Sequence, residues 1–191
     1  MAPSLVAVDQ LTVDVITDNV SDTYASKPPF AVSELANIMQ AGAQEISGTT
    51  LLVANLGYGL RLTTRHGSKE HVLLFDTGTE GAAFLRNCRN LALDLGTVEE
   101  VAITHGHWDH MGALEAAVGA IVARRGQGNV TVNVNPGMFN ERGVLLQNGT
   151  IFPAARVPTP AQLEAWGARV VNDGDARLLL DGHFYYSGEI P

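Results

Sequence analysis

The sequence has a single cysteine, Cys88, among its 191 residues. One cysteine cannot form an internal disulfide, and it excludes a zinc site built from several thiolates. Positive charge is also scarce, because 12 basic residues stand against 20 acidic ones and the formal net charge is −8. This balance disfavours broad attraction to nucleic acid or to an anionic membrane surface. We therefore expect a small-molecule partner.

Long apolar runs are missing as well. No segment stays apolar over the roughly 18 residues that a membrane helix needs, and the N-terminus lacks the basic and apolar regions of a secretory signal. With 46% hydrophobic residues, the chain can still bury one core. These features predict a cytoplasmic protein with no membrane partner, folded as one domain over residues 1–191.

The histidines are concentrated in one place. Three of the six lie in VAITHGHWDHMGALEAA, residues 101–117, between an apolar run and a helix-like pattern. His105 and His107 are one residue apart, whereas Asp109 and His110 are adjacent, so the loop can present two pairs of ligands. The end of a strand before a helix is a favoured place for ligand sites in α/β folds. Imidazole and carboxylate ligands suit Zn²⁺, and also Fe or Mn, in an open catalytic site.

Such a metal site predicts metal-dependent hydrolysis or a related group transfer. A divalent ion lowers the pKa of a bound water to about 7 and polarises a carbonyl or phosphoryl oxygen, and two ions about 3.5–4 Å apart can act together. A polar turn that caps the next helix would explain Asp109, but not three histidines at this spacing. We expect all four side chains to point into one cavity, with Asp109 also the candidate catalytic residue.

The remaining sequence predicts strands first, and then strands that alternate with helices. The expected strands are 11–15, 51–53, 60–64, 72–75, 98–103, 130–134, 169–171 and 178–186. The expected helices are 82–91, 111–125 and 160–166, while 32–46 fits a helix or a loop equally well. This order indicates an α/β fold in which helices cover a sheet.

The segment THGHWDHMGAL resembles the HxHxDH signature of the metallo-β-lactamase superfamily. TVDVITDN, LLFDTG, GARVV and SGEIP are similar to the branch typified by 7,8-dihydropterin-6-methyl-4-(β-D-ribofuranosyl)aminobenzene-5′-phosphate synthase. The resemblance implies a four-layer αβ/βα sandwich with His105, His107, Asp109 and His110 as ligands of one or two zinc ions. It also implies that Asp76 supports the metal-binding loop, although a simple turn former is the other interpretation of that residue.

Two positions depart from this branch. Tyr58 and Asn135 stand where relatives often carry histidine, which puts the synthase reaction in doubt and leaves the superfamily resemblance intact. Tyr58 remains a candidate substrate contact, whereas Asn135 is more typical of a surface turn. Trp108 is either a stacking surface for a pterin-like ring or a packing residue. The alternative function is a non-catalytic metal- or pterin-binding protein of the same fold.

The resemblance also implies that later loops complete the metal site. In this branch the next histidine follows the GEIP segment, and this sequence ends there, at Pro191. His183 is a possible substitute, but its setting in DGHFYYSGEI predicts an exposed turn or edge. We expect the chain to be the N-terminal part of the sandwich, completed by a C-terminal companion fragment or by a homo-oligomer. Alone, it would expose an apolar sheet edge and bind metal weakly.

Overall fold

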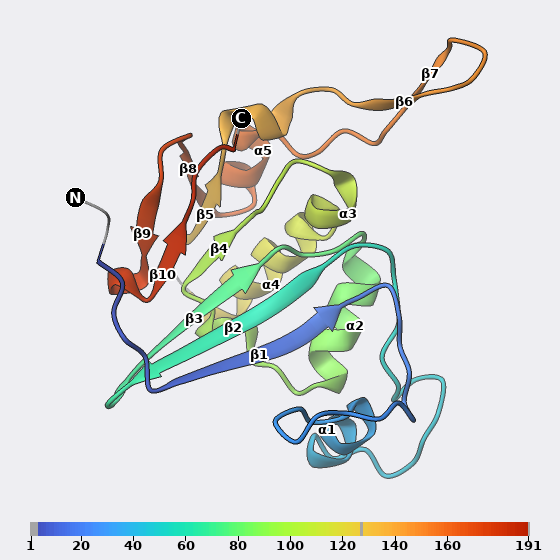
Figure 1. Ribbon diagram of the computed structural model, residues 1–191, viewed down its shortest axis with the longest axis vertical. Coiled ribbons are helices and arrows are strands. Elements are labelled where there is room, and N and C mark those ends of the chain that lie inside the picture. Colours follow the sequence, from blue (N-terminus) through green and yellow to red (C-terminus); the bar gives the residue numbers. More distant parts are fainter. Residues whose placement is uncertain (1–3, 127, 191) are drawn as a thin grey trace.

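A six-stranded mixed sheet forms the centre of the computed structural model, which describes residues 4–126 and 128–190 (Figure 1). In spatial order the strands are β1 (Gln10–Thr17), β2 (Gly59–His66), β3 (Lys69–Phe75), β4 (Glu100–Ala102), β5 (Val130–Val134) and β8 (Ala168–Asn172). The first three are antiparallel, and β3, β4, β5 and β8 are parallel to one another. The predicted α/β class is confirmed.

Helices cover one face of this sheet, and the main core lies between the helices and the sheet. The helices are α1 (Glu34–Gln40), α2 (Gly81–Asn90), α3 (Trp108–Met111), α4 (Leu114–Arg125) and α5 (Pro160–Ala165), with short 3-10 segments η1 (Leu95–Thr97), η2 (Pro136–Phe139) and η3 (Leu180–Gly182). Phe84 and Ile121 are fully buried against Val101 and Val132 of the sheet. Burying each such side chain stabilises the fold by about 1.5–3 kcal/mol.

A second, two-stranded sheet lies on the opposite face. It consists of β9 (Arg177–Leu179) and β10 (Phe184–Tyr186), whose buried side chains pack against β3 and β4. The Tyr186 hydroxyl donates a hydrogen bond to the Ile103 carbonyl at 2.6 Å, and burial raises the pKa of this tyrosine to about 12. Among the described residues the layers are therefore helix, sheet and small sheet, and the fourth layer of the predicted sandwich is not one of them.

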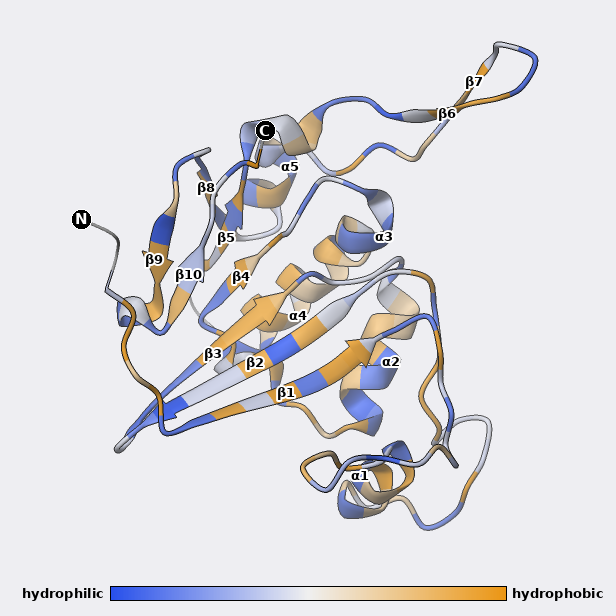
Figure 2. Ribbon diagram, viewed as in Figure 1, coloured by the Kyte–Doolittle hydropathy of each residue, from blue (hydrophilic) through white to orange (hydrophobic). Residues whose placement is uncertain are grey.

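Apolar side chains remain uncovered on several segments, and two groups of them lie on strands. The hairpin of β6 (Gly143–Leu145) and β7 (Ile151–Pro153) projects from the body (Figures 1 and 2), and its apolar side chains are 61% to 72% exposed: Val144, Leu145, Ile151 and Phe152. On β1, Leu11, Val13 and Val15 are also exposed, on the face away from the main core. No helix in the described ranges is long and apolar enough to cross a bilayer.

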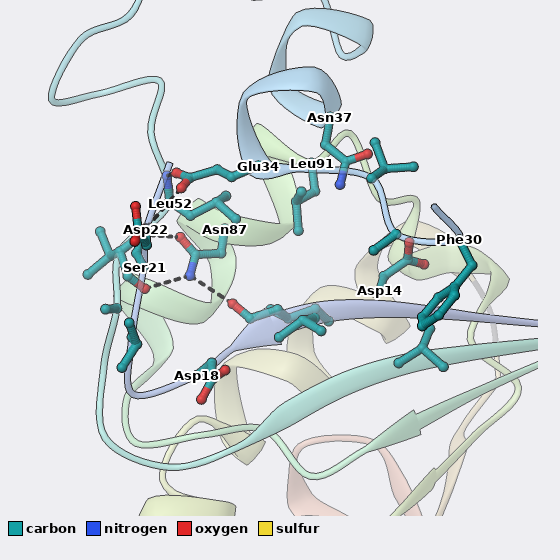
Figure 3. A pocket seen from close by; sticks show the side chains of 18 residues that line it. Asp14, Asp18, Ser21, Asp22, Phe30, Glu34, Asn37, Leu52, Asn87 and Leu91 are labelled. Carbon is teal, nitrogen blue, oxygen red and sulfur yellow. Dashed lines mark hydrogen bonds between the residues drawn. The ribbon is translucent and has the colours of Figure 1, made fainter. Parts of the chain in front are cut away.

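A cavity of about 360 Å³ separates β1 from α1 and the loops around it (Figure 3). Asn87 of α2 lies in its wall and ties the neighbouring segments together. Its Nδ2 donates to the carbonyls of Ile16 and Val53, and its Oδ1 accepts from the Val53 N–H at 2.8 Å. These side-chain hydrogen bonds take the place of strand pairing, so the strand predicted for 51–53 is wrong.

Three other predicted elements differ from the structure. The 111–125 helix is interrupted after Met111, where the Ala113 N–H donates to the Gly78 carbonyl at 3.2 Å instead of to a carbonyl of the helix. The strand predicted for 178–186 is instead the β9–β10 hairpin, since Leu180 and Asp181 have φ angles of 51° and 55° and reverse the chain. Within 32–46, only Glu34–Gln40 is helical.

Candidate metal centre

The histidine loop leaves the carboxyl end of β4 and runs into α3. Two backbone hydrogen bonds join it to the turn after β3: the Asp76 N–H donates to the Ala102 carbonyl at 3.0 Å, and the Thr77 N–H donates to the His110 carbonyl at 2.9 Å. A Cβ at Gly106 would stand 2.0 Å from the Met138 carbonyl oxygen, so only glycine allows the loop to lie this close to η2. The loop is therefore fixed from two sides by the backbone alone.

Asp76 is the most connected carboxylate next to the loop. It is fully buried and has a φ of 55°, in the left-handed region. Its Oδ1 accepts from the Thr104 N–H at 2.8 Å, and its Oδ2 accepts from the Thr104 hydroxyl and from Nδ1 of His110, both at 2.7 Å. Asp76 thus holds the beginning and the end of the THGHWDH segment, and it is more than a turn former.

These hydrogen bonds determine which ring nitrogens carry lone pairs. An ionised carboxylate only accepts, so the Thr104 hydroxyl must donate its single hydrogen to Asp76. Thr104 Oγ1 then accepts from Nδ1 of His105, which lies 2.9 Å away. The Nδ1–H of His110 donates directly to Asp76. In the neutral rings of His105 and His110, Nε2 is therefore the unprotonated nitrogen, the form that binds a metal.

The four candidate ligands form two close pairs. Nε2 of His105 lies 3.1 Å from Nδ1 of His107, and Nε2 of His110 lies 3.6 Å from Oδ2 of Asp109. Two ligands of one tetrahedral zinc, each about 2.0–2.1 Å from the ion, are about 3.4 Å apart. Both pairs fit that separation. The rings of His105 and His110 link the pairs, with centroids 4.1 Å apart.

The pKa values of the two fixed histidines are shifted in opposite directions. The hydrogen bond from His110 to Asp76 raises the pKa of His110, and the charges of Asp76 and Asp109 act in the same direction. Burial lowers the pKa of His105, and the neighbouring His110 and His107 lower it further. Because a ring nitrogen binds metal only when unprotonated, His105 is the readier ligand near neutral pH.

No third donor joins either pair among residues 4–126 and 128–190: no group of three or more His, Cys, Asp or Glu side chains is arranged to hold one ion. His183 lies elsewhere, beneath β2 and β3. Its Nδ1 is 2.9 Å from the Thr64 hydroxyl, and its ring centroid is 4.5 Å from that of His71. His71 precedes Asp76 by five positions along β3, which is about 16 Å. His183 is only 8% exposed, so the predicted exposed turn is wrong.

Two cavities flank the histidine loop. His107 and Trp108 line one of about 500 Å³, whereas Thr104 and His105 line another of about 620 Å³. Asp109 and His110 line neither of these two cavities, and the expectation that all four side chains point into one cavity stays a prediction.

The other predicted contact residues lie at different places. Trp108 is 36% exposed in the wall of the first cavity. Tyr58 is 38% exposed and lines neither cavity, although the adjacent Gly57 approaches the backbone of Asp109 so closely that a Cβ would stand 1.9 Å from its carbonyl oxygen. Asn135 begins η2 as a turn former, but it is buried, so the predicted surface turn is wrong.

Sequence reasoning missed two polar residues of this site. Thr104 stands inside the quoted motif, and a hydroxyl directly before the first histidine was the signal that could have found it. Arg142 borders both cavities. It is far from the motif in sequence, and only the fold brings it there.

Comparison with known families gives one match. Residues 65–126 match the profile of the metallo-beta-lactamase superfamily. That range contains Asp76 and all four candidate ligands. No curated protein matches the sequence. The resemblance to the pterin-related branch remains a prediction.

Solved structures give more distant likenesses. The chain is 19% identical to a metallo-beta-lactamase from Cronobacter sakazakii, with a TM-score of 0.38 over 66% of this chain and 45% of that one. The metallo-beta-lactamase MIM-1 from Novosphingobium pentaromativorans is 19% identical, with a TM-score of 0.37 over 65% of this chain and 43% of that one. A mutant flavo di-iron protein from Thermotoga maritima is 16% identical, with a TM-score of 0.37 over 66% of this chain and 26% of that one. The chain thus spans less than half the length of each, and these likenesses assign no activity.

Proposed function

We propose that the chain is a metal-dependent hydrolase, or a related group-transfer enzyme, that acts on a small molecule. His105, His107, Asp109 and His110 would hold one or two zinc ions, with iron or manganese as alternatives. The observation that supports this most strongly is the hydrogen-bond network of Asp76 and Thr104, which favours the neutral tautomers of His105 and His110 that carry the hydrogen on Nδ1 and a lone pair on Nε2. A polar turn has no need for that arrangement, whereas metal ligands do.

Each residue of the site would have its own role in the proposed reaction. A bound divalent ion would lower the pKa of a water molecule to about 7 and polarise a carbonyl or phosphoryl oxygen. Asp76 and Thr104 orient the histidine rings. Asp109 is the proposed catalytic residue: with Oδ2 on the metal, its other carboxylate oxygen, Oδ1, would accept a proton from the attacking water. Trp108, which lines the cavity beside His107, would contact the substrate, and Tyr58 remains a second candidate contact.

The single thiol of the chain does not offer an alternative nucleophile. Cys88 is buried in the main core, and burial raises the pKa of its thiol to about 12. At neutral pH the thiol is protonated and unreactive. A single buried thiol also suits the reducing conditions of the cytoplasm, which is the location we propose.

The test is hydrolysis of an activated phosphodiester and of a simple lactone by the purified chain, with and without added Zn²⁺, Mn²⁺ or Fe²⁺. Metal-dependent turnover that is lost in Asp109→Ala and kept in Asp173→Ala, an exposed aspartate elsewhere, would support the proposal. Equal turnover in Asp109→Ala would contradict it. Tight binding of a pterin without turnover would instead support the non-catalytic alternative.

A further inference from the structure

The cavity of about 500 Å³ beside the histidine loop has the size of a small-molecule site, for which about 300–1,000 Å³ is typical. His107 and Trp108 form one wall, and the root of the β6–β7 hairpin, with Gly143 and Val144, forms another. A molecule in this space lies directly against one candidate metal ligand. The cavity is therefore the route by which a substrate would reach the proposed metal centre.

Arg142 borders this cavity and is half-buried. Its Nη1 donates to the carbonyls of Met138 and Asn140, and its Nη2 donates to the carbonyl of Gly137, each at 2.8 Å. Because a guanidinium has five N–H donors, Nε–H and one Nη2–H remain, and none of the described residues accepts from them. A carboxylate or phosphate engages two such donors at once.

The position of Arg142 relative to the histidine loop is fixed. The Met138 carbonyl that accepts from Arg142 is the same group against which Gly106 packs. Gly106 lies between His105 and His107 in the motif. The three hydrogen bonds to backbone carbonyls therefore fix the guanidinium against η2, which itself packs against the histidine loop. No ligand is needed to hold it there.

The charge of Arg142 is not balanced by a carboxylate. Within residues 4–126 and 128–190 it takes part in no ion pair, whereas the other cation and the acid of the same cavity, Arg156 and Glu141, pair with each other. Arg142 also borders the second cavity, but Glu189 lines that one and would repel an anion. A half-buried cation without an acidic partner favours an anionic ligand.

We infer that Arg142 binds the oxyanion, a carboxylate or phosphate, of the substrate in the cavity beside His107. Its role as a substrate contact rests on the proposed function, which it makes more specific: the molecule carries an oxyanion next to the bond that is cleaved. Arg142 is then a specificity-determining residue, because a neutral analogue leaves its two remaining donors without an acceptor.

Binding of simple probes tests this inference. We would titrate the purified chain with phenyl phosphate, with benzoate and with neutral phenol, by calorimetry, before and after loading with Zn²⁺. The first two probes distinguish phosphate from carboxylate, and at least one should bind clearly more tightly than phenol. Arg142→Gln should weaken that binding about 10- to 100-fold, to the level of phenol, since a hydrogen-bonded charge is lost.

Glu141→Gln combined with Arg156→Gln is the matched control, because these two side chains border the same cavity and pair with each other, so their joint replacement leaves no unpaired charge. The double variant should change the affinity by no more than about twofold, as expected for an exposed pair. If Arg142→Gln binds both anions as well as the native chain does, or if the double variant loses as much as Arg142→Gln, the inference is wrong. If phenyl phosphate binds only through added zinc, Arg142→Gln will bind it as well as the native chain does, which also contradicts the inference.

A second variant covers the case in which Arg142→Gln fails to fold, since Arg142 also holds the η2 turn. Val144→Glu places a carboxylate on an exposed strand at the cavity wall, and Val144→Gln is its neutral control. Only the glutamate variant should weaken anion binding, while phenol binding stays unchanged. Equal anion binding by both variants would overturn the inference. Absence of metal from the chain would contradict the proposed function alone, because the anion titration is also made without added zinc.

Discussion

Replacing Asp76 with asparagine should move the proton to the other ring nitrogen in two candidate metal ligands, His105 and His110, while keeping the shape of the replaced side chain. Oδ1 can still accept from the Thr104 N–H, so the new amide nitrogen takes the position of Oδ2, next to the Thr104 hydroxyl and Nδ1 of His110. That nitrogen donates where the carboxylate accepted. His110 must then accept through Nδ1 and carry its proton on Nε2. The Thr104 hydroxyl is free to donate to His105, whose proton also moves to Nε2.

The cost follows from these contacts. Two hydrogen bonds to a buried charge are exchanged for neutral ones, which should lower the free energy of unfolding by about 1–3 kcal/mol. Metal affinity should fall about 10- to 100-fold, as is usual when a group that orients a ligand is removed, which equals about 1.4–2.7 kcal/mol. Asp173→Asn, at an exposed loop position, should change neither quantity.

Nitrogen NMR of the imidazole rings, together with metal titration, measures both effects. In the metal-free native chain, Nδ1 of His110 should carry the proton, and in Asp76→Asn the proton should be on Nε2. The same native titration should show a pKa of His110 above its ordinary value, which falls in the variant because the hydrogen bond to Asp76 is the main cause of the increase. An Asp76→Asn chain with the native tautomer and the native metal affinity would refute the reasoning.

Gly106→Ala should lower metal affinity and the thermal midpoint, because the new Cβ would stand 2.0 Å from the Met138 carbonyl oxygen; a native metal titration curve would contradict this packing. Burial lowers the pKa of His183, so the unfolded chain takes up its proton first and the free energy of unfolding should fall between about pH 7 and 5. Denaturant titrations should show a smaller fall in His183→Gln. Asn87→Ala should cost about 2–4 kcal/mol in urea unfolding, since the backbone of Ile16 and Val53 loses three hydrogen bonds.

Much of the fold was predictable because its strands and helices carry clear periodic patterns. The alternation of Val130 to Val134 and the helical spacing up to Arg125, ended by Gly126 with a φ of 68°, reappear in the structure as β5 and α4. The β9–β10 turn was missed because the apolar and aromatic residues on both sides outweighed its turn signal, the dipeptide Asp181-Gly182. The β6–β7 hairpin was missed because its short strands pair only with each other and are exposed, so no burial pattern marks them.

The candidate site was predictable where its parts are local in sequence. The motif alone indicated four candidate ligands and their grouping in two pairs, because neighbouring residues on a short loop must lie close together. The contacts that depend on the fold could not be predicted from the sequence. They are the burial of His183 under Thr64 and the hydrogen bond by which Arg142 is held to η2, beside the histidine loop. Such contacts join residues far apart in the chain, and local pattern contains no information about them.

Metal content is the most direct test of the central claim, that the THGHWDH segment holds the metal. Elemental analysis of the purified chain after zinc loading and desalting should find bound metal in the native chain, and little in His107→Ala and Asp109→Ala, each of which removes one member of a pair. His66→Ala, an exposed histidine at the far end of β2, should retain the native amount. Full metal content in both His107→Ala and Asp109→Ala would show that the ligands lie elsewhere.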